Sequence, residues 1–376
     1  MNLYYFYKGR VALYAILKSI GIGHSDEVLL PGFTCIVVPN AITYLGGVPV
    51  FIDINPITYN INFSKIEENI TYKTKAIIVQ HTFGIPSDMD RIIEIAKKYN
   101  LYVIEDSCHT IGSKYKGKEV GTFGDAAFFS SQWSKPVTTG LGGWAIINNL
   151  RLKEKMERIY PQFIKPSFGE ELMLRLQYFI YSKLYSPSLF WLAQNTYRTL
   201  SKYGIMIGSS TSMELECRMP GGYEKKMSNW QKKLLHKKLK EIDEKIEYRK
   251  YIVSIYRDLF KKKGLPLLDL SIDYQPVYLR YPFLVKNKKE IIEEAKKRHL
   301  EIGDWFVSPV HPNLKNWSRI GYKTGSCPIS EKICSHIINL PTHENITKKM
   351  ALKIVDFIAQ YQDILFINNL LDTISC

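Results

Sequence analysis

The sequence predicts an α/β protein built on a mostly parallel sheet. Apolar runs of strand length recur at Val48–Asp53, Lys75–His81 and Leu101–Asp106, and segments with helical patterns separate them. The last run ends in Glu105 and Asp106, which is typical of a buried parallel strand that delivers acids to the carboxyl edge of a sheet. Strands that alternate with helices at this spacing indicate βαβ units, and therefore parallel pairing.

The first hundred residues supply the opening elements of this pattern. An amphipathic helix is predicted over Gly9–Leu17, and a strand that ends at a turn covers Asp26–Cys35. A short helix is expected at Ser64–Asn69. A longer helix follows a capping turn and runs from about Met89 to Tyr99, so that strands and helices continue to alternate.

The rest of the chain contains one segment of different character. From about Arg151 to Met219 leucine and aromatic residues are frequent, and two short helices broken at Ser186-Pro187 are expected within residues 172–198. Charges and the proline interrupt this segment too often for a membrane span. The remaining predicted elements are the strands Ala126–Phe129, Trp144–Ile147 and Tyr281–Val285 and the basic helices Met227–Lys250 and Lys288–Arg298.

Polar side chains that follow two apolar runs suit a single cofactor. Asp106 ends one strand, Ser130 follows the next, and Lys135 comes five residues later. Pyridoxal 5′-phosphate has a ring nitrogen that needs an acid, an aldehyde that needs an amine, and a phosphate that needs donors. The start of the first helix, at Gly9 and Arg10, offers further phosphate ligands. An ordinary strand ending, a solvated lysine and a solvated arginine are the alternative interpretation.

Three ordered motifs surround these side chains. They are Glu105–His109, Gly121–Ser130 and Lys135, and together they resemble the DegT/DnrJ-type sugar aminotransferases. The resemblance is clear over about the first 150 residues and weaker from Gly222 onward. It implies a pyridoxal-phosphate-dependent transferase of fold type I, with a mostly parallel seven-stranded sheet and a small C-terminal α+β domain.

The resemblance also implies a division of the chain and an assembly. The large cofactor-binding domain is expected at 1–245, with a helical insert at about 160–215, and the small domain at 246–376. Family members share their active sites between subunits, so a homodimer is expected.

Further cofactor contacts are implied residue by residue. Thr34 and Cys35 occupy a turn that lies against the cofactor ring in the family, although an aromatic residue is common where Cys35 stands. His109 matches a position that lies over the ring near its oxygen, where an imidazole can stack and donate a hydrogen bond. Arg10 replaces a phosphate-binding threonine of the family, and its guanidinium could supply charge instead.

One phosphate contact departs from the family pattern. In the family, an asparagine from the neighbouring subunit reaches the cofactor phosphate, but Glu224 stands at that position. A carboxylate repels phosphate. Lys225, Lys226 or Asn229 would then have to replace it, and Lys226 and Asn229 are the candidates we retain.

The candidate substrate contacts are His81, His311 and Phe306. His81 ends a predicted strand, where ligands gather, although a hydrogen-bonded structural histidine is the alternative. The family usually has a histidine near the substrate where Trp305 and Phe306 stand, and His311 follows a few residues later. Substrate handling is therefore expected to differ from that of other members.

Composition limits the partners and the location. The 376-residue chain has 51 basic and 36 acidic residues, a net charge of +15. Its lysine-rich run at Lys225–Lys250 lacks interleaved aromatic residues, so nucleic acid is not expected as a partner. The six cysteines form no metal-like pattern and no signal peptide is recognised, which predicts a cytoplasmic protein and no metal. For residues 172–198, an oligomer contact and a contact with the inner face of the membrane both stay open.

These observations predict an enzyme. The resemblance implies transfer of an amino group from an amino acid, glutamate or glutamine, to a keto group of a nucleotide-linked sugar, with Lys135 and Asp106 as catalytic residues. A related dehydratase branch has histidine in place of the lysine, so Lys135 favours transamination. A non-catalytic or regulatory protein associated with a membrane or a partner is the alternative.

Overall fold

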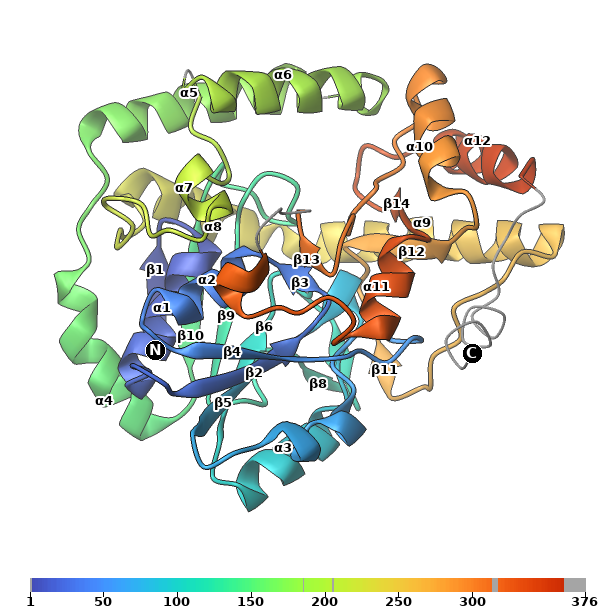
Figure 1. Cartoon of the computed structure of the whole chain (residues 1–376). Helices are drawn as coiled ribbons and strands as arrows, with labels where there is room; N and C mark the ends of the chain where they lie inside the picture. Colours follow the sequence, from blue (N-terminus) through green and yellow to red (C-terminus); the bar gives the residue numbers. More distant parts are fainter. Residues whose placement is uncertain (1, 185, 205, 313–316, 362–376) are drawn as a thin grey trace.

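The computed structural model describes residues 2–184, 186–204, 206–312 and 317–361 (Figure 1). Its largest sheet has seven strands. In chain order these are β1 (Leu3–Phe6), β2 (Glu27–Pro31), β4 (Val48–Ile52), β5 (Thr74–Gln80), β6 (Tyr102–Asp106), β9 (Ala126–Ser130) and β10 (Gly143–Ile147).

The order of these strands is β1-β10-β9-β6-β5-β2-β4. Neighbours from β9 to β4 pair in parallel, and only β10 runs antiparallel to its neighbours β1 and β9. The predicted α/β class and mostly parallel seven-stranded sheet are therefore confirmed. The parallel strands β6 and β9 lie side by side, so their carboxyl ends meet at one edge.

The other elements surround this sheet or form the C-terminal part. The short strands are β3 (Thr34–Cys35), β7 (Lys114–Tyr115), β8 (Lys118–Glu119), β11 (Tyr274–Gln275), β12 (Arg280–Leu284), β13 (Val310–His311) and β14 (Ile337–Pro341). The helices are α1 (Gly9–Ile20), α2 (Val37–Thr43), α3 (Met89–Lys98), α4 (Leu150–Ile159), α5 (Phe168–Leu184), α6 (Phe190–Lys202), α7 (Ser212–Leu215), α8 (Asn229–Lys240), α9 (Ile242–Lys263), α10 (Lys288–Lys297), α11 (Pro328–Cys334) and α12 (Lys348–Ala359).

Both faces of the large sheet are covered, which explains why its strands are apolar throughout. On β2 and β6, Val28 and Ile104 pack with α1, whereas their chain neighbours Leu29 and Val103 pack with α3. Every residue of α1 except Lys18 is buried. The helix that we predicted after residue 8 is thus a central part of the core.

A second core belongs to the C-terminal part of the chain. There β12 and β14 pair antiparallel, and Phe283 and Ile338 from these strands pack with Phe260 of α9 and Ile354 of α12. Helix α9 is continuous through residue 245. The boundary that we placed there stays a prediction.

Two element assignments were wrong. The short helix expected at Ser64–Asn69 is instead two 3₁₀ turns, Phe63–Lys65 and Glu67–Asn69. The single helix expected at Met227–Lys250 is two helices, because α8 ends at Lys240 and α9 begins at Ile242, with Glu241 between them. Both halves carry the same apolar and lysine pattern, so periodicity alone did not reveal the bend.

The predicted helical pair lies across one side of the molecule as α5 and α6, joined by a 3₁₀ turn at Pro187–Leu189 (Figure 1). In the last turn of α5 the ring of Tyr181 lies 5.1 Å from that of Trp133. At the start of α6 Trp191 Nε1 donates to the Leu300 carbonyl at 2.9 Å. The pair therefore bridges the loop that carries Lys135 and the C-terminal part. No helix in the described ranges is both long and apolar enough to cross a bilayer.

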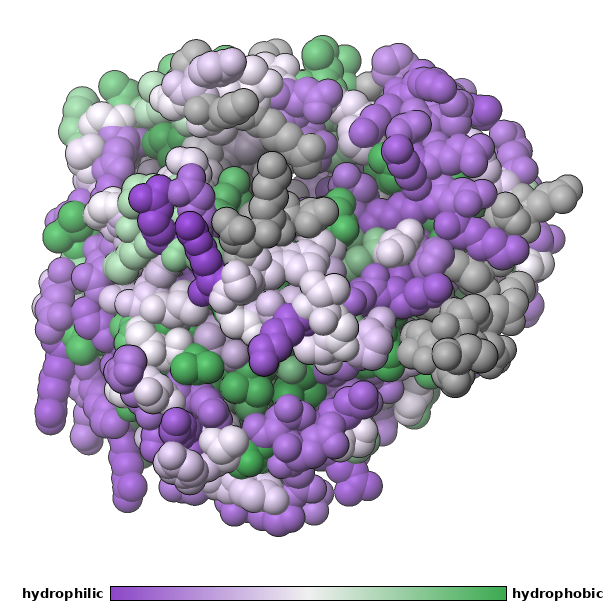
Figure 2. Space-filling view, in the orientation of Figure 1, coloured by the Kyte–Doolittle hydropathy of each residue, from purple (hydrophilic) through white to green (hydrophobic). Residues whose placement is uncertain are grey.

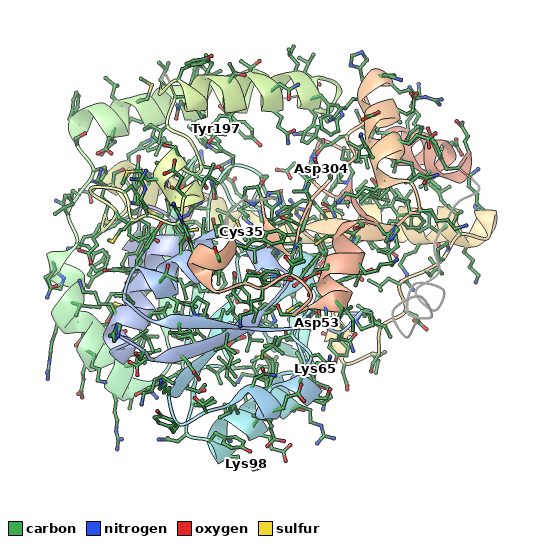
Figure 3. All side chains as sticks on the ribbon, viewed as in Figure 1. Cys35, Asp53, Lys65, Lys98, Tyr197 and Asp304 are labelled. Atoms are coloured by element: carbon green, nitrogen blue, oxygen red, sulfur yellow. The ribbon has the colours of Figure 1, made fainter. Side chains whose placement is uncertain are left out.

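A buried carboxylate at the end of β4 joins the two cores (Figure 3). Asp53 Oδ1 accepts hydrogen bonds from the Ser330 amide at 2.9 Å and the Ser330 hydroxyl at 2.7 Å. Asp53 Oδ2 accepts one from the Ile329 amide at 2.9 Å. These amides are first-turn donors of α11, which lack partners within the helix.

We expect Asp53→Ala to destabilise the fold by about 3 kcal/mol or more, because buried donors of α11 lose their acceptor. The free energy of unfolding in guanidinium chloride measures this loss. Asp90→Ala is the matched control, since Asp90 is an exposed acid that pairs with Lys116. Equal losses for the two variants would contradict the proposed connection.

Candidate active site

The predicted acid and amine lie at neighbouring strand ends of the large sheet. Asp106 is the last residue of β6, and Ser130 is the last residue of β9. Asp106 faces Phe128 in the ladder, and the amide of Ser107 donates to the Phe128 carbonyl at 3.0 Å. Because Lys135 follows Ser130 after a short turn, parallel pairing brings the acid and the amine to the same edge of the sheet.

Asp106 is a buried carboxylate with few partners. Its Oδ1 accepts a hydrogen bond from the Cys108 amide at 3.1 Å. Burial raises the pKa of Asp106, while Cys108 and the positive charge of Lys135 lower it. A cationic group beside this carboxylate would offset its desolvation.

Lys135 is half-buried, and within the described ranges its amine makes no hydrogen bond or ion pair. Its Nζ lies 5.4 Å from the centre of the Trp305 ring. Burial lowers the pKa of Lys135, whereas nearby Cys108, Asp106 and Cys35 raise it. A lowered pKa increases the fraction of neutral amine, which is the nucleophilic form.

His109 lies against Trp305 and near the charge of Lys135. Its ring centre lies 4.7 Å from that of Trp305, edge to face, and its Nδ1 accepts a hydrogen bond from the Phe83 amide at 3.3 Å. Burial and the charge of Lys135 lower the pKa of His109 well below its usual range. The ring is therefore neutral, and acceptance at Nδ1 assigns the proton to Nε2. His109 can thus donate one hydrogen bond from Nε2.

The start of α1 lies against the end of β9. A Cβ on Gly9 would stand 3.0 Å from the Phe129 carbonyl and 3.0 Å from Ser130 Cβ, so a larger residue would push the start of α1 away from the end of β9. The capping position of α1 is Lys8, and no side chain caps the helix. Free first-turn amides beside the Ser130 hydroxyl are suited to a phosphate.

Arg10 has a partner that the sequence did not reveal. Its Nη1 lies 2.6 Å from Oε1 of Glu214, which is 1% exposed and belongs to the predicted insert. Lys8 Nζ lies 3.6 Å from the other oxygen of Glu214. Although burial raises the pKa of Glu214, Arg10 and Lys8 lower it to about 2. The charge of Arg10 is therefore balanced inside the chain.

Thr34 and Cys35 lie on β3, which pairs in parallel with β13. The Thr34 hydroxyl is buried and donates to Gln80 Oε1 at 2.7 Å. Cys35 is half-buried, and burial raises the pKa of its thiol while Arg10 and Lys135 lower it. Cys35 thus lies near the candidate amine, whereas the Thr34 hydroxyl is committed to Gln80.

The candidate substrate contacts occupy different surroundings. His81 is fully buried, with Nε2 3.1 Å from Glu105 Oε2 and Nδ1 accepting from the Ser87 amide at 3.0 Å, so neither nitrogen is left for a ligand. Phe306 is also fully buried, and its ring lies 4.4 Å from that of Phe33. His311 ends β13 with its ring 5.8 Å from Phe306. The interpretation of His81 as a substrate ligand thus finds no support.

Trp305, one residue before Phe306, is the aromatic side chain that meets Lys135 and His109. The sequence analysis named Phe306 and not Trp305. The two rings stack with their centres 4.5 Å apart, and Trp305 is the one that reaches Lys135 and His109. The role of Phe306 toward a substrate stays a prediction. Glu214 was also missed. The Thr211–Glu214 capping box was readable from the sequence, but the contact with Arg10 was not.

Lys226 and Asn229 do not approach the amine of their own chain in the described contacts. Lys226 Nζ donates to the Pro161 carbonyl at 3.3 Å. Asn229 is exposed at the first position of α8. Glu224, at the family asparagine position, pairs with Lys18 at 2.7 Å. The role of Lys226 and Asn229 as phosphate ligands stays a prediction, and it requires a neighbouring subunit.

The donor set fits the cofactor that the sequence predicts. Asp106 offers a buried acid for a ring nitrogen, Lys135 an uncommitted amine for an aldehyde, and His109 an N–H for a ring oxygen. Gly9 and Ser130 offer a cradle for a phosphate. No group of three or more metal-ligating side chains occurs among the described residues.

Comparison with known proteins agrees with this chemistry. The model of the DegT/DnrJ/EryC1/StrS aminotransferase family matches residues 6–359. The chain is 31% identical to the uncharacterized protein MJ1066 of Methanocaldococcus jannaschii, over 92% of this chain and 81% of that protein. It is 30% identical to the GDP-perosamine synthase of Escherichia coli O157:H7, over 94% of this chain and 84% of that protein.

Solved structures share the fold. An aminotransferase from Psychrobacter cryohalolentis superposes with a TM-score of 0.71 at 24% identity, covering 95% of this chain and 86% of that chain. A DegT DnrJ EryC1 StrS aminotransferase from Brucella abortus gives a TM-score of 0.71 at 22% identity, covering 95% and 85%.

We expect Glu214→Gln to destabilise the protein by about 3 kcal/mol or more at neutral pH, because Arg10 and Lys8 would remain buried without a counter-charge. The free energy of unfolding in urea measures this loss. Glu216→Gln is the matched control, since that exposed acid pairs with Arg218 at the surface.

The loss of unfolding free energy in Glu214→Gln should also depend on pH. The pKa of Glu214 lies at about 2 in the folded chain, against 4.5 ordinarily, so its contribution is complete above pH 4.5 and disappears as the pH falls toward 2. The difference between wild type and Glu214→Gln should therefore shrink below pH 4.5. A difference that is small at neutral pH, or that grows on acidification, would contradict the ion-pair account.

Proposed function

The chain belongs to the DegT/DnrJ/EryC1/StrS aminotransferase family, and we propose that it transfers an amino group from an amino acid to a keto group of a nucleotide-linked sugar. Similar proteins carry names of this activity: GDP-perosamine synthase, and the dTDP-3-amino-3,6-dideoxy-alpha-D-galactopyranose transaminase of Aneurinibacillus thermoaerophilus, which is 29% identical over 94% of this chain. Glutamate or glutamine is the proposed donor, and the aminated sugar would enter surface polysaccharide or glycoconjugate synthesis.

The juxtaposition of Lys135 and Asp106 carries this proposal. Each side chain alters the pKa of the other, and both lie at the carboxyl edge of the parallel sheet. When bound, pyridoxal phosphate supplies an electron-withdrawing ring that stabilises negative charge on the substrate carbon. A non-catalytic protein has no need of an uncommitted lysine beside a buried acid, so that alternative is not favoured.

The residues of the chain have separate tasks in this proposal. Lys135 would take the proton from the α-carbon of the amino donor as a base, and it would deliver a proton to the sugar carbon that gains the amine as an acid. Asp106 keeps a proton on the ring nitrogen by its negative charge. His109 would donate from Nε2 to the ring oxygen, and Gly9 and Ser130 would hold the phosphate with N–H and O–H groups.

We also infer that a second copy of the chain covers the outer face of α5. Phe168, Leu172, Leu176 and Phe179 are 83%, 55%, 53% and 60% exposed on one side of this helix, whereas Leu174 on the other side is buried. Figure 2 shows hydrophobic residues among polar ones along the edge where α5 and α6 lie. An apolar row of this kind favours a partner.

Light scattering on the purified full chain tests this inference. We expect a dimer, and we expect Leu172→Gln, Leu176→Gln and Phe179→Gln together to shift it to monomer. The control is the double variant Tyr72→Gln and Ile272→Gln, which should stay a dimer. These two side chains are 89% and 90% exposed and lie outside α5. A wild-type monomer that sediments with anionic lipid vesicles would overturn the inference and favour a membrane contact.

We expect the purified protein to be yellow, and borohydride to fix the cofactor on Lys135. Lys135→Ala should lose both the fixation and the turnover, because no other amine replaces it. Asp106→Asn should keep the cofactor but react about 100- to 10,000-fold more slowly, since the ring nitrogen loses its acid. Absorbance, peptide mapping and single-turnover kinetics measure these effects.

Lys97→Ala, at an exposed position of α3, is the control and should behave as wild type. A colourless protein that gains no absorbance with added pyridoxal phosphate would contradict the proposed function. So would full turnover of Asp106→Asn.

A further inference from the structure

A lysine of the C-terminal part reaches two backbone carbonyls. Lys288 is the first residue of α10, and its Nζ donates to the Phe306 carbonyl at 2.8 Å and to the Cys334 carbonyl at 2.8 Å. Burial lowers the pKa of Lys288 to about 8, while Cys334 and Asp304 raise it, so the amine stays largely protonated at neutral pH. Both hydrogen bonds are therefore charge-assisted.

The position of Lys288 is unfavourable for its own helix. A positive charge at the N-terminus of a helix opposes the helix dipole. The Cys334 carbonyl, in contrast, belongs to the last residue of α11, where carbonyls lack partners within the helix and a positive charge is favourable. Lys288 thus stabilises α11 and the segment that contains Phe306 rather than α10.

Helix α11 is held by charged groups at both ends. Asp53, at the end of β4, accepts hydrogen bonds from its first-turn amides, and Lys288 donates to its last carbonyl. Figure 3 shows Asp53 below α11 and Asp304, two residues before Phe306, above it. Helix α11 therefore connects the large sheet to the segment around Phe306.

The segment that Lys288 holds has few other ties. Before it, Gly303 exchanges two backbone hydrogen bonds with Asn339, of 2.8 and 2.9 Å, and after it the Pro309 carbonyl accepts from the first amide of β3 at 2.8 Å. Among the described residues, the bond from Lys288 is the one hydrogen bond made by the backbone of residues 304–308. Lys288 is thus a principal tie of this segment.

Trp305 lies in this segment, next to the candidate amine. Its ring centre lies 5.4 Å from Lys135 Nζ and 4.7 Å from the ring centre of His109. The Trp305 ring also stacks on the ring of Phe306, which is fully buried. A shift of the Phe306 backbone would therefore move the Trp305 ring relative to the amine.

We propose that Lys288 is a positioning residue, which fixes the ring of Trp305 beside Lys135. It acts through the carbonyl of Phe306 rather than by contact with the reacting atoms. The effect on turnover rests on the proposed function, in which Lys135 is the catalytic amine, whereas the effect on the position of Trp305 does not. In that function the Trp305 ring limits how a substrate carbon approaches the amine, so its displacement impairs catalysis.

Proton NMR of the cofactor-free full chain with ¹³C-labelled histidine tests the position of Trp305. An aromatic ring shifts the resonances of nearby protons, so the His109 signal reports on the Trp305 ring, and His109→Gln identifies that signal. We expect Lys288→Met to move the signal toward its position in Trp305→Ala. Lys288→Arg can donate to both carbonyls and should leave the signal near the wild-type value. In the Trp305→Ala chain, Lys288→Met should cause no further movement.

Two controls separate this effect from a general loss of structure. His81 is fully buried and pairs with Glu105, so its signal in the same spectrum should stay unchanged while the core is intact. Lys289→Met is the matched variant, because Lys289 is the exposed lysine next to Lys288 on α10, and it should keep the wild-type His109 signal. If Lys288→Met does not fold, Lys288→Gln, which keeps a neutral N–H donor, replaces it and should move the signal part of the way.

Turnover supplies a second readout. We expect Lys288→Met to lower kcat for the proposed amino transfer about 10- to 100-fold, because a small displacement near the reacting groups is costly. Lys288→Arg should restore most of the rate. In the Trp305→Ala chain, Lys288→Met should add little to the loss, since both changes act on the same ring.

An unchanged His109 signal in Lys288→Met and Lys288→Gln would overturn the inference, because stacking on Phe306 alone would then hold Trp305. Changes that add in the double variant with Trp305→Ala would also overturn it. If the signal moves as expected but the wild type aminates no keto-sugar, the positioning role stands and the proposed function fails. The two failures are thus distinguishable.

Discussion

Parallel pairing of β6 with β9 is the constraint on which the site depends. It brings Asp106 and the loop that carries Lys135 to one edge of the sheet, although twenty-nine positions separate them in the sequence. Burial then acts on the two groups in opposite senses, raising the pKa of the carboxyl and lowering that of the amine. Asp106 would hold the protonated ring nitrogen of pyridoxal phosphate, and Lys135 would be the amine for its aldehyde, so a bound cofactor would give both buried groups a partner. The helices on either face serve to hold these strands in register.

The meeting of Asp106 and Lys135 was predictable because the carboxyl ends of parallel strands share one edge of a sheet. The resemblance to the family then indicated which residues at that edge contact the cofactor. The class of fold and the seven-stranded sheet followed from apolar runs and from resemblance. The break between α8 and α9 was not predictable, because both helices continue one pattern of apolar and basic residues. The pairing of Arg10 with Glu214 was hidden because 204 positions separate them and no local period marks the contact. The contact of Trp305 with Lys135 was not predictable, because adjacent Trp305 and Phe306 offer similar aromatic side chains and only the fold decides which one reaches the amine.

The segment at about 160–215 contacts several parts of the candidate site. It contributes Glu214, which balances Arg10 where the family has a threonine, and it lays α5 and α6 between Trp133 near the amine and Leu300 of the C-terminal part. The contacts of Arg10 and of Trp133 therefore involve one segment of the chain. The same segment presents an apolar outer row on α5, where we infer the contact with a second copy.

The ¹⁵N chemical shift of the ring nitrogen of labelled pyridoxal phosphate bound to the full chain tests the central claim most directly. If Asp106 faces that nitrogen across the ring from Lys135, the nitrogen stays protonated at neutral pH and loses its proton in Asp106→Asn. A nitrogen that is already deprotonated in the wild type, or that is unaffected by the substitution, would contradict the arrangement on which the account is built.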